Sequence, residues 1–252
     1  MPTPIDERLS LVVPIWNEEE AIQVMVDVAR AALDALVADA ELGGYEMVLV
    51  DDASTDGTGK LLDELAASDS RIHVVRHERN RGLGGAVRSG LAASTGDLVL
   101  YTDADLPFDL REIGRLMRIV RTYQADVLSG YRLDRRSEGF RRTLYSGVYN
   151  GLIRLSLGLR VRDVNFACKL LRRRVLDAVQ LESEGSFIDA ELMARADRMG
   201  FSIVQVGLDY FARSRGVSTL SSWGTISGIL SEWRALAPEI RRLGPPGIGN
   251  SR

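Results

Sequence analysis

Four short polar segments contain the residue types that bind metal ions, phosphates and nucleotides. The most informative is Asp103-Ala104-Asp105, which directly follows an apolar run. On extended backbone, residues two positions apart point to the same side, so these two carboxylates converge. Two like charges so placed repel each other unless a cation lies between them, and Mg²⁺ or Mn²⁺ takes one or two carboxylates together with diphosphate oxygens and water. Asp103 and Asp105 are therefore the candidate metal ligands.

The other three segments also adjoin strand-like runs. Pro14 to Glu18 follows the first run, Asp51 to Thr58 follows the second, and Asn80 to Ala86 opens a helix-like segment. A simpler explanation exists for the first segment, because proline ends a strand and Asn17 suits the N-cap of a helix. An acid at a strand end, such as Asp52, can accept hydrogen bonds from a ribose or a base. The glycine-rich segment lacks the Walker lysine and the full dinucleotide fingerprint.

Alternating strand-like and helix-like segments must position these groups. The apolar pattern predicts strands at 9–13, 47–50, 72–75, 97–101, 126–129 and 201–206, and helices at 18–38, 57–67, 84–93, 110–123, 144–159, 187–199 and 225–236. This alternation predicts an α/β fold with a mostly parallel central sheet flanked by helices, and amphipathic helices towards the C-terminus. In such a sheet, ligands bind beyond the carboxyl ends of the strands.

Length and composition restrict the class of protein. A chain of 252 residues with one cysteine needs no disulfide framework, and it fits a reducing compartment. No signal peptide is evident, and no apolar run approaches the ~20 residues that cross a bilayer. We expect a single domain over 1–243, a disordered tail over 244–252, and a cytoplasmic protein that is free or peripheral on the inner face of the membrane. No nucleic-acid partner is expected.

Positive charge is concentrated in the second half. Between Arg132 and Arg174 there are twelve Arg or Lys and three acids, although the whole chain has a net charge of −3. This stretch is either a solvated surface or a face that meets phosphate or an anionic membrane.

The four segments, in this order, resemble the family-2 glycosyltransferases with the GT-A fold, which is Rossmann-like. The resemblance runs from about Leu9 to Leu220, with a nucleotide-sugar half at about 9–131 and an acceptor half at about 132–243. It implies inverting transfer of mannose or glucose from a nucleotide-sugar of the GDP-mannose or UDP-glucose class, with Mg²⁺ or Mn²⁺. It also implies residue roles: Pro14, Trp16, Glu18 and Asp52 near the nucleoside, and Asp103 and Asp105 at the metal and diphosphate, with Asp105 catalytic.

The second half resembles the dolichyl- and polyprenyl-phosphate glycosyltransferases, such as the dolichol-phosphate mannose synthases. Matching pieces include Gly130-Tyr131-Arg132, Asp163 to Phe166 and Arg213 to Ser218. The resemblance implies a polyprenyl-phosphate lipid as acceptor, a membrane surface, and a membrane partner subunit or homo-oligomer for anchoring. Its implied acceptor-phosphate residues are Arg132, Arg142, Ser146 and Arg213, with Arg132 and Arg213 also catalytic.

The acceptor chemistry leaves alternatives. A phosphate monoester is largely ionised at neutral pH, so it needs arginines to position it but no base. A hydroxyl acceptor needs a carboxylate base, for which Asp189 and Glu191 are the candidates. A third alternative is a non-catalytic module that binds a nucleotide-sugar or a lipid. Segments 144–153 and 223–236 lie at a membrane interface in one interpretation and are ordinary core helices in the other.

Overall fold

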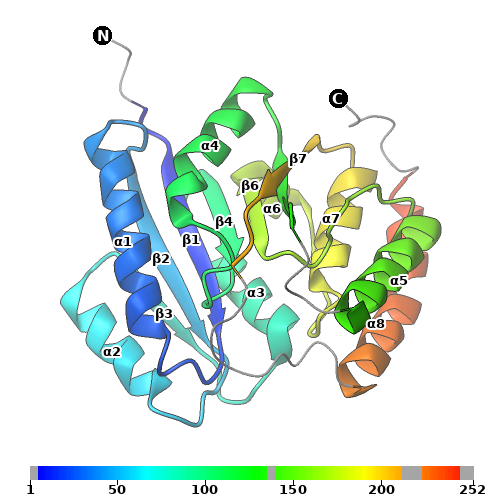
Figure 1. Ribbon diagram of the computed structural model, residues 1–252, viewed down its shortest axis with the longest axis horizontal. Helices are drawn as coiled ribbons and strands as arrows, with labels where there is room; N and C mark the ends of the chain where they lie inside the picture. Colours follow the sequence, from blue (N-terminus) through cyan, green and yellow to red (C-terminus); the bar gives the residue numbers. More distant parts are fainter. Residues whose placement is uncertain (1–4, 135–139, 212–222, 245–252) are drawn as a thin grey trace.

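One seven-stranded sheet, in the order β3-β2-β1-β4-β6-β5-β7, organises the chain (Figure 1). This computed structural model describes the backbone of residues 5–134, 140–211 and 223–244, and their side chains except those of 140–146, 148 and 223–226. All strand pairings are parallel except those of β6 with β4 and β5. The strands are β1 (Arg8–Ile15), β2 (Gly44–Asp51), β3 (Ile72–Arg76), β4 (Leu98–Thr102), β5 (Val127–Arg132), β6 (Cys168–Arg172) and β7 (Ile203–Leu208).

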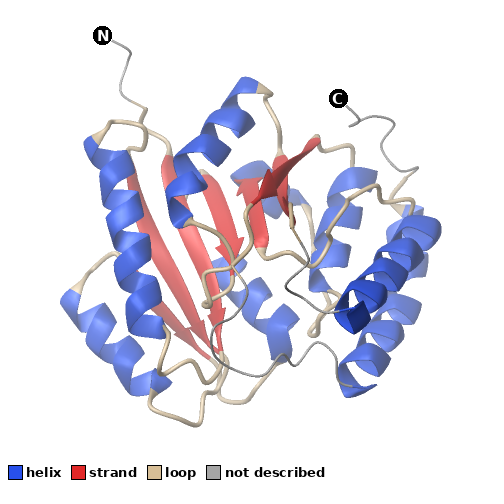
Figure 2. Ribbon diagram, in the orientation of Figure 1, coloured by secondary structure: helices blue, strands red, loops and turns tan. Residues whose placement is uncertain are grey.

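Helices cover both faces of the sheet (Figure 2). One layer contains α1 (Ile22–Ala38), α2 (Thr58–Ser68), the short 3₁₀ helix η1 (Leu110–Glu112) and α4 (Ile113–Thr122). The other contains α3 (Gly82–Ala93), α5 (Phe140–Leu157), α6 (Arg173–Ala178), α7 (Ile188–Arg198) and α8 (Trp223–Arg242). Each layer buries its own apolar cluster against one face, so the fold is the predicted α/β sandwich.

The sequence pattern misses one strand and one helix. β6 and α6 fall in the stretch Cys168-Lys169-Leu170-Leu171-Arg172 and the arginines after it, where charged residues interrupt the apolar pattern. Lys169 is fully buried inside β6. A buried lysine is rare without a specific partner, and here its Nζ donates to the Phe166 carbonyl at 2.5 Å.

The predicted cap of α1 is wrong. The helix begins at Ile22 after Ala21, with no side-chain cap, and Asn17 lies upstream of it in a left-handed conformation with φ of 55°. Asparagine tolerates this conformation because its short amide hydrogen-bonds locally. Its role is to cross-link two loops at the end of the sheet.

Helices α5 and α8 pack side by side and have an inner face in the core. Ile153 and Leu157 of α5 and Ala237 and Ile240 of α8 are buried, and the Trp233 indole donates to Ser156 Oγ at 2.9 Å. No helix in the described part of the chain is long and apolar enough to cross a membrane. The predicted tail, 244–252, lies outside the described residues except for Gly244.

Close contact between α3 and the sheet depends on Gly90. A Cβ at this position would lie 2.4 Å from Val12 Cγ1 and 2.9 Å from Val50 Cγ2, on β1 and β2. By contrast, a Cβ at Gly228 of α8 would meet nothing within 4 Å.

We expect Gly90→Ala and Gly228→Ala to change stability in opposite directions. The first overpacks the interface between α3 and the sheet and lowers the free energy of unfolding by ~1–3 kcal/mol. The second replaces an exposed helical glycine and raises it by ~0.5–1 kcal/mol. Urea denaturation of both variants measures the difference. Equal effects in the two variants would contradict the close packing of α3.

Candidate functional site

Four parallel strands end at one edge of the sheet, and the predicted site residues follow them. Pro14 is half-buried near the end of β1, and Trp16 directly after the strand has 48% of its surface exposed. Asp51 and Asp52 stand at the end of β2, and Asp103 follows β4. The structure therefore brings together the segments that the sequence placed near a nucleoside and a metal, at the edge where parallel sheets bind ligands.

The loops after β1 and β2 are tied to each other. Asn17 Oδ1 accepts from the Thr55 amide at 2.8 Å, and the Asn17 amide donates to Ser54 Oγ at 3.1 Å. The Glu18 amide donates to Thr58 Oγ1 at 2.9 Å. These bonds use the polar residues of both segments to hold one loop against the other, which fixes where Trp16 is presented.

The two acids at the end of β2 have different partners. Asp51 accepts from the Ser54 amide at 2.9 Å and from Arg76 Nε at 3.1 Å, so it shapes the loop. Asp52 is 3% exposed, and its Oδ1 lies 2.6 Å from His77 Nδ1 and 2.8 Å from the amide nitrogen of Arg81.

The chain of contacts from Asp52 continues through His77. The other ring nitrogen, Nε2, lies 2.8 Å from Ser89 Oγ on α3. His77 therefore links the acid at the end of β2 to α3. Sequence analysis missed both His77 and Ser89, because a single histidine far from the motif carries no pattern.

Asp103 and Asp105 are half-buried on a turn after β4, and Leu106 next to them has φ of 53°. The alternation of an extended strand, on which the sequence argument relied, does not apply to this turn. Burial raises the pKa of the Tyr101 hydroxyl, and the charges of Asp189, Asp103 and Asp105 add to this shift, so both carboxylates of the turn act on the same group.

The side chains at this turn fit a hard divalent cation whose remaining ligands come from the bound substrate. No group of three His, Cys, Asp or Glu side chains in the described residues is arranged to hold a metal. Asp103 and Asp105 offer only carboxylate oxygens, which suit Mg²⁺ or Mn²⁺ when substrate phosphates supply the remaining ligands.

Arg132, at the end of β5, forms a buried bidentate ion pair. Its Nε and Nη2 donate to the two carboxylate oxygens of Asp163 at 2.7 and 2.8 Å. The guanidinium carbon also lies 5.8 Å from the ring centroid of Phe166 and 5.2 Å from that of Tyr210. Arg132 is thus fixed at the edge of the sheet, with its Nε and Nη2 engaged by Asp163.

Behind these loops lies a group of buried polar atoms, several of which have no hydrogen bond in the described residues: the Tyr101 and Tyr149 hydroxyls and Asp189 Oδ1. Burial raises the pKa of Asp189 to about 6, Lys169 opposes the shift, and Asp163 adds to it. Asp189 and Tyr101 interact electrostatically, so α7 brings this acid towards the turn of Asp103. Buried polar groups that lack partners are costly, and they concentrate where ligands bind.

Glu191, the second predicted base, has its partners within the protein. Its carboxylate is fully buried and accepts from the amides of Glu182 and Ser183 and from Arg195 Nε at 2.8 Å. This arrangement fastens the loop before α7. A catalytic role of Glu191 stays a prediction.

The glycine-rich segment serves close packing of two loops. Gly82 has φ of +73°, and a Cβ on Gly84 would lie 2.4 Å from the Ser183 carbonyl oxygen. The Gly85 amide donates to the Glu184 carbonyl at 3.1 Å. Residues 183–185 occupy the space over the start of α3, which explains the glycines without a phosphate.

Several predicted acceptor residues are not described. Arg213 lies outside the described residues, and only the backbone of Arg142 and Ser146, on α5, is described. The arginines of the basic stretch lie at both ends of the sheet. Arg172 pairs with Glu7 and Arg174 with Asp126, near the amino ends of β4 and β5, whereas Arg132 lies at the carboxyl edge.

Sequence comparison identifies the family and some relatives. A profile of glycosyl transferase family 2 matches residues 10–180. Polyprenol monophosphomannose synthase of Mycolicibacterium smegmatis is 32% identical over 226 residues, which cover 85% of this chain and 82% of the relative. Glycosyltransferase AglD of Haloferax volcanii is 34% identical over 81% of this chain, which spans about a third of that relative's length (33%). An undecaprenyl-phosphate 4-deoxy-4-formamido-L-arabinose transferase of Sodalis glossinidius is 34% identical over 71% of this chain and 53% of its own length.

Structural comparison agrees. Glucosyl-3-phosphoglycerate synthase from Mycobacterium tuberculosis, solved with Mn²⁺, UDP-glucose and phosphoglyceric acid, matches with a TM-score of 0.64 at 24% identity, over 89% of this chain and 79% of that one. This likeness confirms the GT-A fold. With the family profile covering more than half of its length, the chain belongs to glycosyl transferase family 2 and is a glycosyltransferase related to enzymes that transfer sugars to polyprenyl phosphates.

Proposed function

We propose that this enzyme transfers a hexose, mannose or glucose, from a GDP- or UDP-sugar to a polyprenyl phosphate, with inversion at the anomeric carbon. The main support for this proposal is the similarity to a polyprenol monophosphomannose synthase over most of both chains. In the reaction an acceptor phosphate oxygen forms a bond to the anomeric carbon, and the bond from that carbon to the donor diphosphate breaks.

The carboxyl edge of the sheet supports the donor half of the proposal. Trp16 is 48% exposed, and Asp52 is buried with an orientation fixed by His77 and the Arg81 amide. We assign Pro14, Trp16, Glu18 and Asp52 to the nucleoside. Asp103 and Asp105 would hold Mg²⁺ or Mn²⁺, which offsets the charge of the departing diphosphate when bound.

The acceptor half is supported by Arg132. An acceptor phosphate is already ionised, so the protein must place it and offset its charge. Arg132 is oriented by Asp163 and by two aromatic rings, which supports its assignment as a fixed positive charge near the acceptor phosphate. We assign Arg132 to this role together with Arg142, Ser146 and Arg213.

A hydroxyl acceptor is the second candidate, and Asp189 is the observation that favours it. A buried carboxyl with a pKa raised to about 6 has the properties of a general base that works near neutral pH. A phosphate acceptor leaves this carboxyl without a proton to remove.

A lipid acceptor requires contact with a membrane surface. Leu155 of α5 is 89% exposed next to the buried positions of the same helix. We propose that the outer side of α5 and α8 meets the interface while the inner side remains in the core.

We expect nucleotide binding to depend on the metal and on Asp105. Thermal unfolding with UDP, GDP and their glucose and mannose conjugates, with and without Mn²⁺, should show a Mn²⁺-dependent rise in Tm for one base. Asp105→Asn should abolish that rise and reduce turnover by at least ~100-fold, because a ligand carboxylate is lost. The half-buried site should leave the fold intact.

Asp109→Asn is the matched control, since this nearby acid pairs with Arg111. It should retain the metal-dependent rise. A rise that persists in Asp105→Asn would overturn the metal assignment, and no rise with any nucleotide would count against a nucleotide-sugar donor.

His77→Ala should weaken nucleotide binding by about tenfold, or ~1.4 kcal/mol. The substitution removes a partner from the buried carboxylate of Asp52, which then loses its fixed orientation. Calorimetric titration with the nucleotide measures the dissociation constant. The only other histidine, His73, is 55% exposed and serves as the control as His73→Ala. Equal affinity in both variants would remove His77 from the donor site.

Asp189→Asn distinguishes a phosphate acceptor from a hydroxyl acceptor, and it should change how the stability of the protein depends on pH. The folded pKa of Asp189, about 6, lies above its ordinary value of 3.8, so the carboxyl favours the folded state when protonated. Stability from this group is therefore present below pH ~4 and is lost as the pH rises through about 6. Between pH 4 and pH 8 the asparagine variant should gain ~3 kcal/mol relative to the wild type.

Turnover of the same variant tests whether Asp189 acts as a general base. With a phosphate acceptor, Asp189→Asn should keep activity within about tenfold, whereas loss of a general base costs ~100-fold or more. A loss of the larger size would favour the hydroxyl acceptor. Parallel stability curves for the wild type and Asp189→Asn would contradict the raised pKa.

A further inference from the structure

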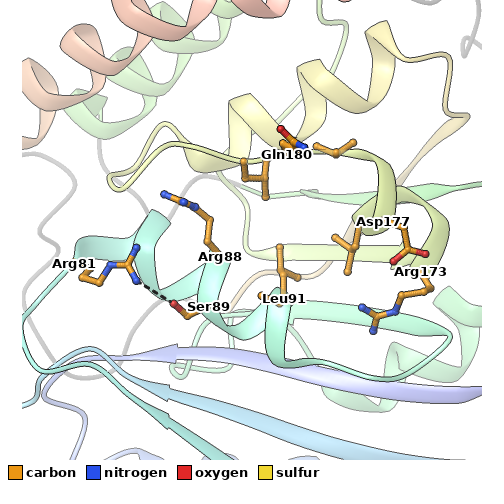
Figure 3. A pocket seen from close by; sticks show the side chains of 11 residues that line it. Arg81, Arg88, Ser89, Leu91, Arg173, Asp177 and Gln180 are labelled. Atoms are coloured by element: carbon orange, nitrogen blue, oxygen red, sulfur yellow. Dashed lines mark hydrogen bonds between the residues drawn. The ribbon is translucent and has the colours of Figure 1, made fainter.

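A cavity of about 500 Å³ lies beside α3, next to the residues that orient Asp52, because Arg81 and Ser89 line it and also contact Asp52 and His77. Its walls are α3 on one side and α6 with the following segment 179–181 on the other (Figure 3). None of the acids assigned to the donor or the metal lines it. The volume is in the range of the clefts and cavities that bind small organic ligands.

Three arginines and one acid give the cavity its charge. Arg81, Arg88 and Arg173 line it, and Asp177 is the acid among its lining residues. Glu184, outside the lining, pairs with Arg81 at 2.7 Å and with Arg88 at 3.2 Å. One carboxylate thus serves two guanidinium groups, and the cavity keeps an excess of positive charge.

Each arginine has a nitrogen donor without a close hydrogen bond to the residues that the structure describes. Arg88 donates only through Nη1, to the Glu182 carbonyl at 2.9 Å and to Glu184, which leaves Nε and Nη2 without hydrogen bonds to described residues. Arg173 uses Nε and Nη2 on the Gly96 carbonyl and Ser94 Oγ, and its Nη1 has no hydrogen bond within the described part of the chain. Arg81 Nη1 has only a 3.5 Å contact with Ser89 Oγ.

The cations lie at two ends of the cavity. Figure 3 shows Arg81 and Arg88 towards one end and Arg173 towards the other, with Leu91 between them. Leu176, Val179 and Leu181 add apolar surface to the walls. An occupant that satisfies both ends needs two anionic groups joined by a short segment with nonpolar C–H surface. Phosphate groups suit guanidinium donors best, because the paired N–H groups match their oxygens.

We propose that this cavity is a second anion site, which binds a small organic bisphosphate outside the transfer site. The binding needs Arg88 and Arg173 and no metal ion. It does not depend on the identity of the sugar donor or of the acceptor.

Calorimetric titration of the full chain with fructose 1,6-bisphosphate tests the proposal. EDTA in the buffer removes divalent cations, so that the probe cannot bind through a metal at Asp103 and Asp105. We expect binding to the wild type and an increase in Kd of about tenfold or more in Arg88→Gln and in Arg173→Gln. Fructose, which lacks the phosphates, should not bind.

Arg115→Gln is the matched control. This arginine is half-exposed on α4, in the opposite helix layer, and its loss changes the net charge equally. Affinity for the probe should stay within about twofold of the wild type in this variant. Because Arg173 also holds the Gly96 carbonyl and Arg88 the Glu182 carbonyl, thermal unfolding checks that each variant is folded. The two substitutions lie on different elements and so give independent answers.

Three results would overturn the proposal. One is the absence of binding to the wild type at millimolar probe. Another is an equal loss of affinity in all three variants, which would indicate attraction to net charge alone. The third is binding that Arg132→Gln removes and Arg88→Gln keeps, since the probe would then occupy the carboxyl edge. The nucleotide titration with Mn²⁺ tests the donor site separately, so failure of either proposal leaves the other standing.

Discussion

The insertion of β6 between β4 and β5 is the constraint on which the arrangement of the site depends. Because β6 runs against its neighbours, its first residue pairs with the last residue of β4, and the segment before it reaches the carboxyl edge. That segment carries Asp163 and Phe166, which hold Arg132 from two sides. The reversal therefore places the residues that orient Arg132 at the carboxyl edge of the sheet.

Strand β6 also places the positive charge of Lys169 near the buried carboxyl of Asp189. Lys169 lies opposite Tyr101 in the register of β4 and β6 and opposite Ser129 in that of β5 and β6. Its charge acts on Asp189 from within the core and limits the rise in that pKa. A fully buried lysine near an acid whose oxygen has no hydrogen bond in the described residues lowers the stability of the core. Such destabilising groups are typical of sites selected for binding or chemistry.

The elements that could be predicted from the sequence are those with a strong apolar pattern. The apolar pattern predicts β1 and β2, which are buried on both faces, and the helices beside them, which bury one face each. Asp103 and Asp52 are candidates because they come directly after such strands, and their roles stay predictions. β6 could not be found, since Lys169 breaks its apolar run and the antiparallel direction is set by tertiary pairing. The same limit applies to His77, whose partners Asp52 and Ser89 are distant in sequence.

The loop before α7 connects α8 to the residues around Asp52 by hydrogen bonds. Glu232 of α8 accepts from the Glu184 and Gly185 amides at 2.9 and 2.7 Å, and the Glu184 carboxylate holds Arg81, whose amide binds Asp52. A displacement of α8 therefore acts on the residues that orient Asp52 through directly bonded groups. These contacts therefore connect α8, which we propose meets the lipid surface, to Asp52, which we assign to the nucleoside.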